Sequence, residues 1–131
     1  MFSADHAVVN LNLWITDDDA LMDPKEDGKA TTGGLIVYTA TAPEEWSFED
    51  YNNYDSGSKI MKYLNEVKSE KVEIPYKQNR AVIFNSKLFH ETMPATFKPG
   101  YKNRRINVTL LFGVQHNARR TCGTLGHCKG D

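Results

Sequence analysis

Residues 88–113, LFHETMPATFKPGYKNRRINVTLLFG, hold the pattern that decides the fold. His90 comes just after a strand-like run, and Arg105 follows fifteen residues later at the start of another. Polar and apolar residues alternate over 105–113, so Arg105 and Asn107 fall on one face of the predicted strand. A Pro-Gly break precedes this strand. The stretch therefore predicts β-structure that carries a histidine and an arginine at fixed places.

Upstream, four further runs are rich in β-branched and aromatic residues and predict strands. They cover residues 7–16, 35–40, 71–75 and 80–85. One helix is expected over about 58–69, where apolar residues recur at helical spacing and Ser56 or Ser58 can cap the start. Residues 17–32 predict a loop, and residues 41–55 are expected to cover the outside of a sheet. Many short strands and one helix predict an all-β sandwich or barrel.

The first predicted strand has an unusual polar face. Asn10, Asn12 and Trp14 fall on one face, and the apolar residues between them fall on the other. Such a face is usually wetted by solvent. Together with Arg105 and Asn107 it could equally line a ligand cavity, and the sequence leaves both interpretations open.

Composition limits the class of protein. The chain has 131 residues, 40% of them hydrophobic, which is enough for one domain with a core. Its formal net charge of −1 gives no electrostatic case for binding nucleic acid or an anionic membrane. Both cysteines, Cys122 and Cys128, lie in the last ten residues, so a reducing, cytoplasmic compartment is expected. We expect residues 1–113 to form the core and residues 114–131 a mobile tail.

Three side chains suggest metal and carboxylate chemistry when they are taken together. Asp5 stands just before the first predicted strand, and His90 and Arg105 come late in the chain. A carboxylate and an imidazole on one side of an iron leave positions open for a chelating co-substrate and O₂. A guanidinium can hold the far carboxylate of a keto-acid in a bidentate pair. Asn107 or Thr109, on the same face as the arginine, can complete that hold.

Three segments resemble the core of 2-oxoglutarate/Fe(II)-dependent oxygenases, on the branch related to phytanoyl-CoA and prolyl hydroxylases. They are ADHAVVNLNLWIT (4–16), GGLIVY (33–38) and the stretch from Asn79 to Gly113. The resemblance covers nearly everything from about residue 3 to residue 113. Its final block is the most specific part, because a histidine, a loop and an arginine follow the family's order and spacing. It implies an all-β double-stranded β-helix (jelly-roll) core with one flanking helix, and with either a truncated N-terminus or an edge that a partner chain covers.

The resemblance also implies the cofactors and their ligands. Fe(II) would be held by Asp5 and His90, and 2-oxoglutarate by Arg105, Asn107 and Asn12. The implied reaction is hydroxylation of an unactivated C–H bond by O₂, coupled to decarboxylation of 2-oxoglutarate to succinate. The resemblance does not name the primary substrate, which would be a small molecule or a peptide.

The chain departs from the family pattern at the first metal ligand. The family has a His-x-Asp pair; its aspartate matches Asp5, and its histidine would stand where this chain has Ser3. A serine hydroxyl is a poor ligand for Fe(II), and His6 would point to the opposite face of an extended segment. The family also has a helix and at least one strand before this pair. We therefore expect either a fragment of a longer protein or a barrel edge covered by a partner, such as a second copy in a homo-oligomer.

Two other interpretations remain. One is a catalytically inactive oxygenase-like jelly roll that binds a ligand without turnover, which Ser3 favours. The other is a cupin-like isomerase or carbohydrate-binding jelly roll, which the spacing of Arg105 and the lack of a second histidine near His90 disfavour. Four metal-capable residues of the tail match no zinc-site spacing: His116, Cys122, His127 and Cys128.

Overall fold

Nine strands and two helices make up the part of the chain that the computed structural model describes, residues 2–5, 7–52 and 55–113. The strands are β1 (Phe2–Ser3), β2 (Val9–Trp14), β3 (Lys25–Glu26), β4 (Lys29–Ala30), β5 (Leu35–Thr41), β6 (Lys71–Ile74), β7 (Ala81–Asn85), β8 (Leu88–Thr92) and β9 (Asn107–Phe112). The helices are α1 (Phe48–Tyr51) and α2 (Gly57–Glu66), and two 3-10 turns are η1 (Asp18–Ala20) and η2 (Tyr101–Asn103).

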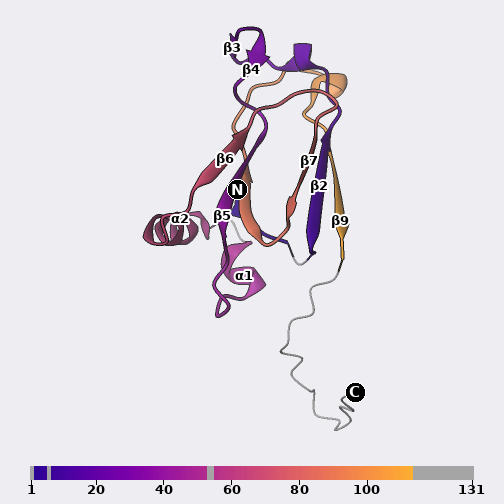
Figure 1. Cartoon of the computed structure of the whole chain (residues 1–131). Coiled ribbons are helices and arrows are strands. Elements are labelled where there is room, and N and C mark those ends of the chain that lie inside the picture. The colour runs from indigo at the N-terminus through magenta and orange to yellow at the C-terminus, as the bar shows by residue number, and fades with distance from the viewer. Residues whose placement is uncertain (1, 6, 53–54, 114–131) are drawn as a thin grey trace.

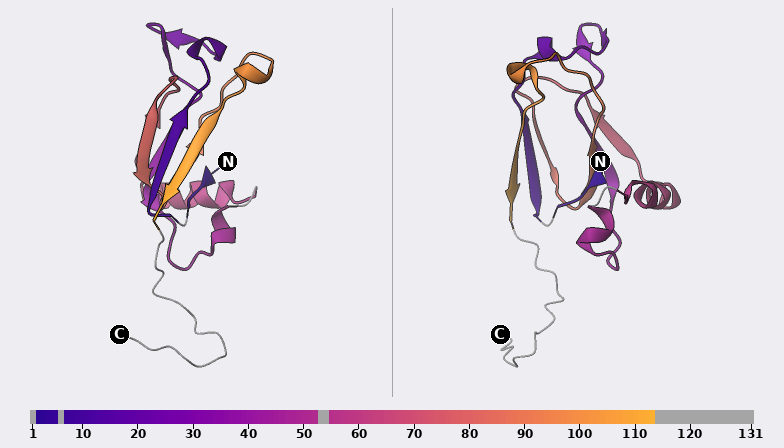
Figure 2. Two further views of the ribbon diagram at one scale, coloured as in Figure 1. Left: turned by 90° about the vertical axis from the view of Figure 1, so that its right-hand side faces the viewer. Right: turned by 180° about the vertical axis from the view of Figure 1, so that it is seen from behind.

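Two antiparallel sheets face each other across the interior (Figures 1 and 2). The four-stranded sheet has the order β1-β8-β5-β6, and the three-stranded sheet has the order β7-β2-β9. The small β3–β4 hairpin lies at the end where loops run between the sheets (Figure 1). In the three-stranded sheet β2 is central: Asn12 pairs with Val82 on one side and Thr109 on the other. The chain is therefore mostly β-structure, with its interior between two facing sheets.

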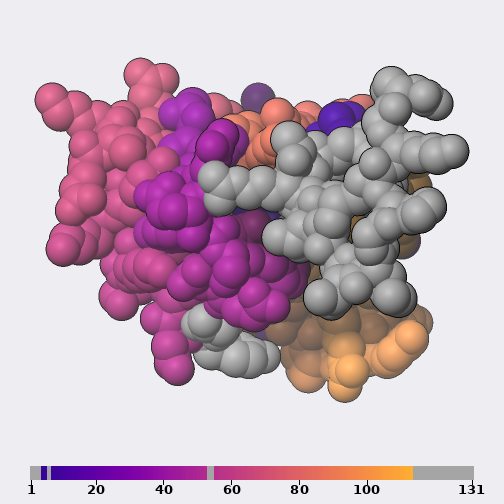
Figure 3. Space-filling model, turned by 90° about the horizontal axis from the view of Figure 1, so that it is seen from below, coloured from indigo at the N-terminus to yellow at the C-terminus, as the bar shows by residue number. Residues whose placement is uncertain are grey.

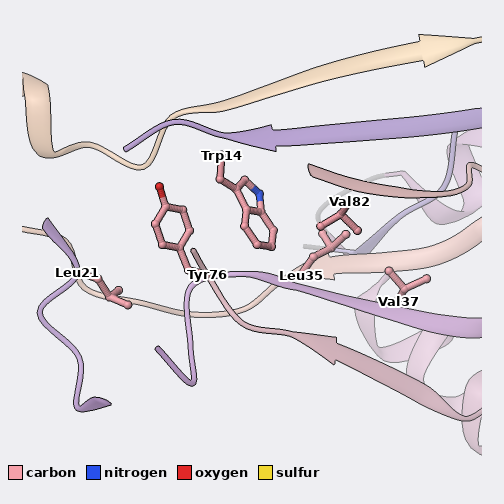
Figure 4. Packing of buried hydrophobic residues seen from close by; sticks show 6 residues of the cluster. All are labelled: Trp14, Leu21, Leu35, Val37, Tyr76 and Val82. Carbon is pink, nitrogen blue, oxygen red and sulfur yellow. The ribbon is translucent and has the colours of Figure 1, made fainter. Parts of the chain in front are cut away.

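Apolar side chains from both sheets fill one end of this interior (Figure 4). The buried members of the cluster are Trp14, Leu21, Leu35, Val37, Tyr76 and Val82. The Trp14 ring stacks on the Tyr76 ring at a centroid distance of 5.5 Å, and Trp14 is fully buried. Burying one large apolar side chain contributes roughly 1.5–3 kcal/mol. Because the cluster takes residues from both sheets, its burial holds the two sheets together.

A second apolar cluster lies on the outer side of the four-stranded sheet, under the helices. Ile60 and Leu64 of α2 are buried one helical turn apart and pack with Phe89 of β8. The edges of the Tyr51 and Tyr63 rings contact the Phe89 ring. Seen from below, α2 projects on one side of the molecule and β9 lies on the other (Figure 3). The helices thus cover one sheet and leave the outer face of the other uncovered by any described residue.

All five predicted strands are present, and each differs from its predicted range at one end or at both ends. Runs expected at 7–16, 35–40, 71–75, 80–85 and 105–113 correspond to β2, β5, β6, β7 and β9. The predicted face of β2 is confirmed, since Asn10, Asn12 and Trp14 are all buried and point into the interior. The interpretation of this face as the wet side of a sheet is therefore wrong.

Other expectations need correction. His90 was expected after a strand, but it lies inside β8, and Arg105 was expected to open a strand but precedes β9. The helix expected over 58–69 is α2, which ends at Glu66. The loop expected over 17–32 contains η1 and the β3–β4 hairpin, and the irregular 41–55 segment contains α1. The described strands form three antiparallel sheets rather than a closed barrel.

Within the described residues, no helix is both long and apolar enough to cross a lipid bilayer. The expectations for the tail, including its mobility and its four metal-capable residues, fall outside the described residues, as does the orientation of His6.

Candidate functional site

Asp5 and His90 meet at the inner side of the four-stranded sheet. His90 belongs to β8 and is buried, and its Nε2 lies 3.7 Å from Oδ2 of Asp5. Its Nδ1 lies 3.0 Å from the carbonyl oxygen of Leu88, and the Phe84 ring packs against the imidazole at 4.9 Å between centroids. The Asp5 backbone is fixed as well, because its N–H donates to the Ser86 carbonyl at 2.9 Å. Nε2 of His90 and Oδ2 of Asp5 therefore face each other, and each residue is also held by a contact with a backbone carbonyl.

This pair fits one divalent cation. When the Nδ1 proton of a neutral imidazole is donated to Leu88, the Nε2 lone pair faces the Asp5 carboxylate. Two acceptors held this way attract a cation between them, and a histidine whose other nitrogen binds a carbonyl is the usual metal-ligand arrangement. Two donor atoms about 2.1 Å from one ion stand roughly 3.0–3.6 Å apart for angles of 90–120°. The observed separation of 3.7 Å needs only a small adjustment.

A third protein ligand is missing from the described part of the chain. No group of three His, Cys, Asp or Glu residues there is placed to hold a metal ion. The backbone of Ser3 is nevertheless in the expected place, because Ser3 in β1 is the register partner of His90 in β8. Register partners in an antiparallel pair share a face of the sheet. The backbone of position 3 therefore lies beside His90, and the described side chains supply two candidate ligand atoms, one from Asp5 and one from His90.

A ladder of hydrogen bonds runs from Asp5 along the interior face of β2. Nδ2 of Asn10 donates to Oδ2 of Asp5 at 2.7 Å, and Nδ2 of Asn12 donates to Oδ1 of Asn10 at 2.7 Å. Oδ1 of Asn12 then accepts from Nδ2 of Asn107 at 2.6 Å and from the Thr109 hydroxyl at 3.0 Å. The Asn10 amide thereby holds the Asp5 carboxylate, and the ladder gives the interior a polar stripe beside the apolar cluster around Trp14.

Arg105 lies beyond the far end of the ladder. Its Nε donates to the carbonyl of Gly33 at 2.8 Å, and its NH2 group donates to the carbonyl of Gly34 at 3.3 Å. The guanidinium carbon stands 5.8 Å from the centroid of the Trp14 ring. Burial lowers the pKa of Arg105 from its ordinary value, and desolvation likewise raises the pKa of Tyr76 nearby. Among the described residues no carboxylate lies within 4 Å of Arg105, so its charge is not neutralised there.

Two buried polar atoms near Arg105 have no hydrogen-bond partner among the described residues. They are Nε1 of Trp14 and Oδ1 of Asn107, which belong to register partners on β2 and β9. An unmet buried donor or acceptor costs about 1–3 kcal/mol. The Trp14 N–H and the Asn107 side-chain oxygen can therefore hydrogen-bond to water or to a polar ligand that lies near the Arg105 guanidinium. Asn10, which contacts Asp5, and Trp14, which lies near Arg105, are separated by about 13 Å along the backbone of β2.

The structure thus brings together residues that are far apart in sequence. Asp5 and His90 converge, and Asn12, Asn107 and Thr109 form one hydrogen-bonded group. Arg105 is turned inward and half-buried, whereas Arg104 is exposed and lies over the Tyr101 ring. The functional roles of these residues remain predictions.

Sequence reasoning missed two contributions to the site. Asn10 was placed on the correct face but not recognised as the partner of Asp5; its alternation with Asn12 was the available signal. The carbonyls of Gly33 and Gly34 hold Arg105, and the sequence shows no sign of this contact.

Comparison of the chain with protein-family models, with curated proteins and with solved structures found no match.

Proposed function

We propose that this chain is the core of a 2-oxoglutarate/Fe(II)-dependent oxygenase with a double-stranded β-helix fold. The strand order supports the fold, because the consecutive strands β7, β8 and β9 belong alternately to the two facing sheets. Alternation between sheets is how a jelly roll is wound. The site supports the function, because a carboxylate and an imidazole lie at one place in the interior and an arginine lies farther along it.

The proposal rests above all on the Asp5–His90 pair, whose donor atoms face each other at 3.7 Å. These two residues would hold Fe(II), with Asn10 fixing the orientation of the Asp5 carboxylate. Fe(II), when it is bound with 2-oxoglutarate and O₂, supplies the oxidising chemistry. The chain itself would position the co-substrate and keep bulk water away from it.

Arg105 would bind the far carboxylate of 2-oxoglutarate. Its Nε and one terminal nitrogen are held by glycine carbonyls, so the guanidinium is oriented in advance. The unmet N–H of Trp14 is a second donor next to it. Asn107 and Asn12, which are hydrogen-bonded to each other, would complete the polar wall.

The test is anaerobic titration with Fe(II) and 2-oxoglutarate, followed by assay of succinate in air. We expect a weak visible charge-transfer band that His90→Ala abolishes. Arg105→Gln removes a charged donor pair and should weaken 2-oxoglutarate binding roughly 10- to 100-fold. Arg104→Gln is the matched control and should leave binding unchanged, since Arg104 is exposed. Equal effects of the two arginine variants would contradict the proposed role of Arg105.

A second candidate is a non-catalytic binding module, which is favoured because the described residues offer no group of three His, Cys, Asp or Glu side chains placed to hold a metal ion. In this case the interior would bind a carboxylate through Arg105 without turnover. The same titration separates the candidates: saturable 2-oxoglutarate binding without a visible band or succinate supports the binding module. A band together with succinate supports the oxygenase.

A further inference from the structure

A pocket of about 470 Å³ lies between the β3–β4 hairpin and the turn that joins β6 to β7. It is separate from the Asp5–His90 pair, and its volume falls in the range typical of small-molecule sites. Its lining residues come from three segments: Asp18 of η1; Lys25, Gly28, Lys29 and Ala30 of the hairpin; and Pro75, Tyr76, Lys77 and Arg80 of the turn.

The pocket is basic although the chain as a whole is not. Four cationic side chains and one carboxylate line it, a difference of three positive charges at neutral pH, whereas the formal net charge of the chain is −1. None of the four cations has a carboxylate within 4 Å among the described residues. The single carboxylate of the lining, Asp18, accepts through Oδ1 from the backbone N–H of Gln78 at 2.7 Å. The lining of the pocket therefore carries three more positive than negative side chains.

Backbone carbonyls fix two of these cations. The Lys25 ammonium donates to the Asp18 carbonyl at 3.1 Å, and the Arg80 guanidinium donates to the Pro75 carbonyl at 2.5 Å. A carbonyl holds a cation in place without cancelling its charge, so both retain donors for an anion. Lys29 and Lys77 are exposed and can close over a ligand from opposite walls.

The walls also offer a fixed apolar surface. Tyr76 is buried, its hydroxyl donates to the Thr16 carbonyl at 2.5 Å, and its ring stacks on Trp14. Pro75 and Ala30 flank it. The hairpin wall turns at Asp27 and Gly28, which both have positive φ, so the hairpin has a tight two-residue turn. The pocket thus combines several cations with a small apolar wall.

We infer that this pocket binds a small organic anion, a phosphate ester or a polycarboxylate, through Lys25, Lys29, Lys77 and Arg80. Several cations converging on one cavity favour a ligand with more than one negative oxygen. The apolar wall formed by Tyr76 and Pro75 accounts for an organic part. This inference does not depend on the proposed oxygenase function, since it needs neither the metal nor Arg105.

The experiment is isothermal titration of the whole chain, without added metal, with glycerol 3-phosphate, citrate and inorganic phosphate in separate runs. We expect saturable binding that weakens as KCl is raised, because the contacts are charged. The double variant Lys29→Gln/Lys77→Gln should weaken binding roughly tenfold or more. Both lysines are exposed, so the variant should fold, and its thermal unfolding checks this. Lys62→Gln, which removes an exposed lysine of α2, is the matched control.

Each outcome decides the inference. Tighter binding of glycerol 3-phosphate than of citrate identifies a phosphate ester as the ligand class, and the reverse identifies a polycarboxylate. Saturable binding of none of the three anions overturns the inference. An equal loss of affinity in Lys62→Gln and in the double variant also overturns it, because the effect would then reflect net charge alone.

Discussion

The residue that most limits the proposed chemistry is Ser3. Its backbone is the register partner of His90 in the neighbouring strand β8. The distance between Asp5 and His90 suits a metal ion, but two protein ligands bind it weakly compared with three. Under the proposed function, we therefore expect the residue at this register position to affect how tightly a metal is bound.

Replacing Ser3 with histidine is expected to strengthen metal binding. A third ligand on the same face would add a donor where the strand pairing already places it. We expect the dissociation constant for Co(II) or Fe(II), measured by anaerobic optical titration, to fall roughly tenfold or more. Ser58→His, on the exposed surface of α2, controls for a histidine that binds metal alone. If Ser3→His and Ser58→His give the same affinity, position 3 is not part of the site.

Sequence alternation predicted the inward direction of individual residues better than it predicted their partners. It placed Asn12 and Trp14 on one face because the side-chain period of a strand is fixed. It could not show that Arg105 binds the carbonyls of Gly33 and Gly34, because that contact depends on how a distant turn folds.

At the scale of elements, the predicted strands had runs with recognisable β-forming residues, and the missed helix and strands have at most five residues each. β8 was missed because LFHET has neither a clear alternation nor a bounded apolar run. The β3–β4 hairpin carried a signal, since Asp27-Gly28 is a typical two-residue hairpin turn. α1 has only four residues, too few for helical periodicity to be visible.

Gly34, just before β5, lies against the end of β6, and its carbonyl accepts a hydrogen bond from Arg105. A Cβ added to Gly34 would stand 1.8 Å from the Ile74 carbonyl oxygen and 2.7 Å from the carbonyl carbon of Pro75. Backbone atoms cannot give way cheaply, so Gly34→Ala must displace β5 from β6. We expect a loss of about 3 kcal/mol or more in the free energy of unfolding, measured by urea denaturation.

Gly28→Ala is the matched control for this prediction. Gly28 has a φ of +72°, but a Cβ there would meet nothing within 4 Å. Its replacement should cost only about 1 kcal/mol, from backbone strain alone. A loss in Gly34→Ala no larger than in Gly28→Ala would show that β5 and β6 are not packed as closely as their backbones indicate.

At the scale of the whole molecule, the two sheets differ in how their outer faces are covered. Helices pack on the four-stranded sheet, whereas the outer face of β7-β2-β9 is bare among the described residues. Large apolar residues stand on this face, with Ile83 65% exposed and Phe112 51% exposed. Leu110, which lies with Phe112 on the edge strand β9, is 47% exposed. Monomeric proteins rarely leave such a continuous apolar face in water.

We expect a second copy of the chain to cover this face. The register pairs Leu11 with both Ile83 and Leu110, so one apolar row crosses all three strands and two copies can match it. Among the described strands, β9 pairs on one side only, and such an edge is a template for strand pairing. Sedimentation velocity over a concentration series should show self-association driven by burial of this apolar surface.

Lysine substitutions on the outer face of β7-β2-β9 test whether this face is the surface through which the chain self-associates. Ile83→Lys combined with Leu110→Lys should shift the chain to the monomer, because burying unpaired ammonium groups in the contact is costly. Val72→Lys is the control: Val72 is 54% exposed but lies on β6, in the other sheet. It should leave the association unchanged. A wild-type chain that sediments as a monomer at every concentration, or a Val72→Lys variant that dissociates as fully as the double variant, would contradict self-association through β7-β2-β9.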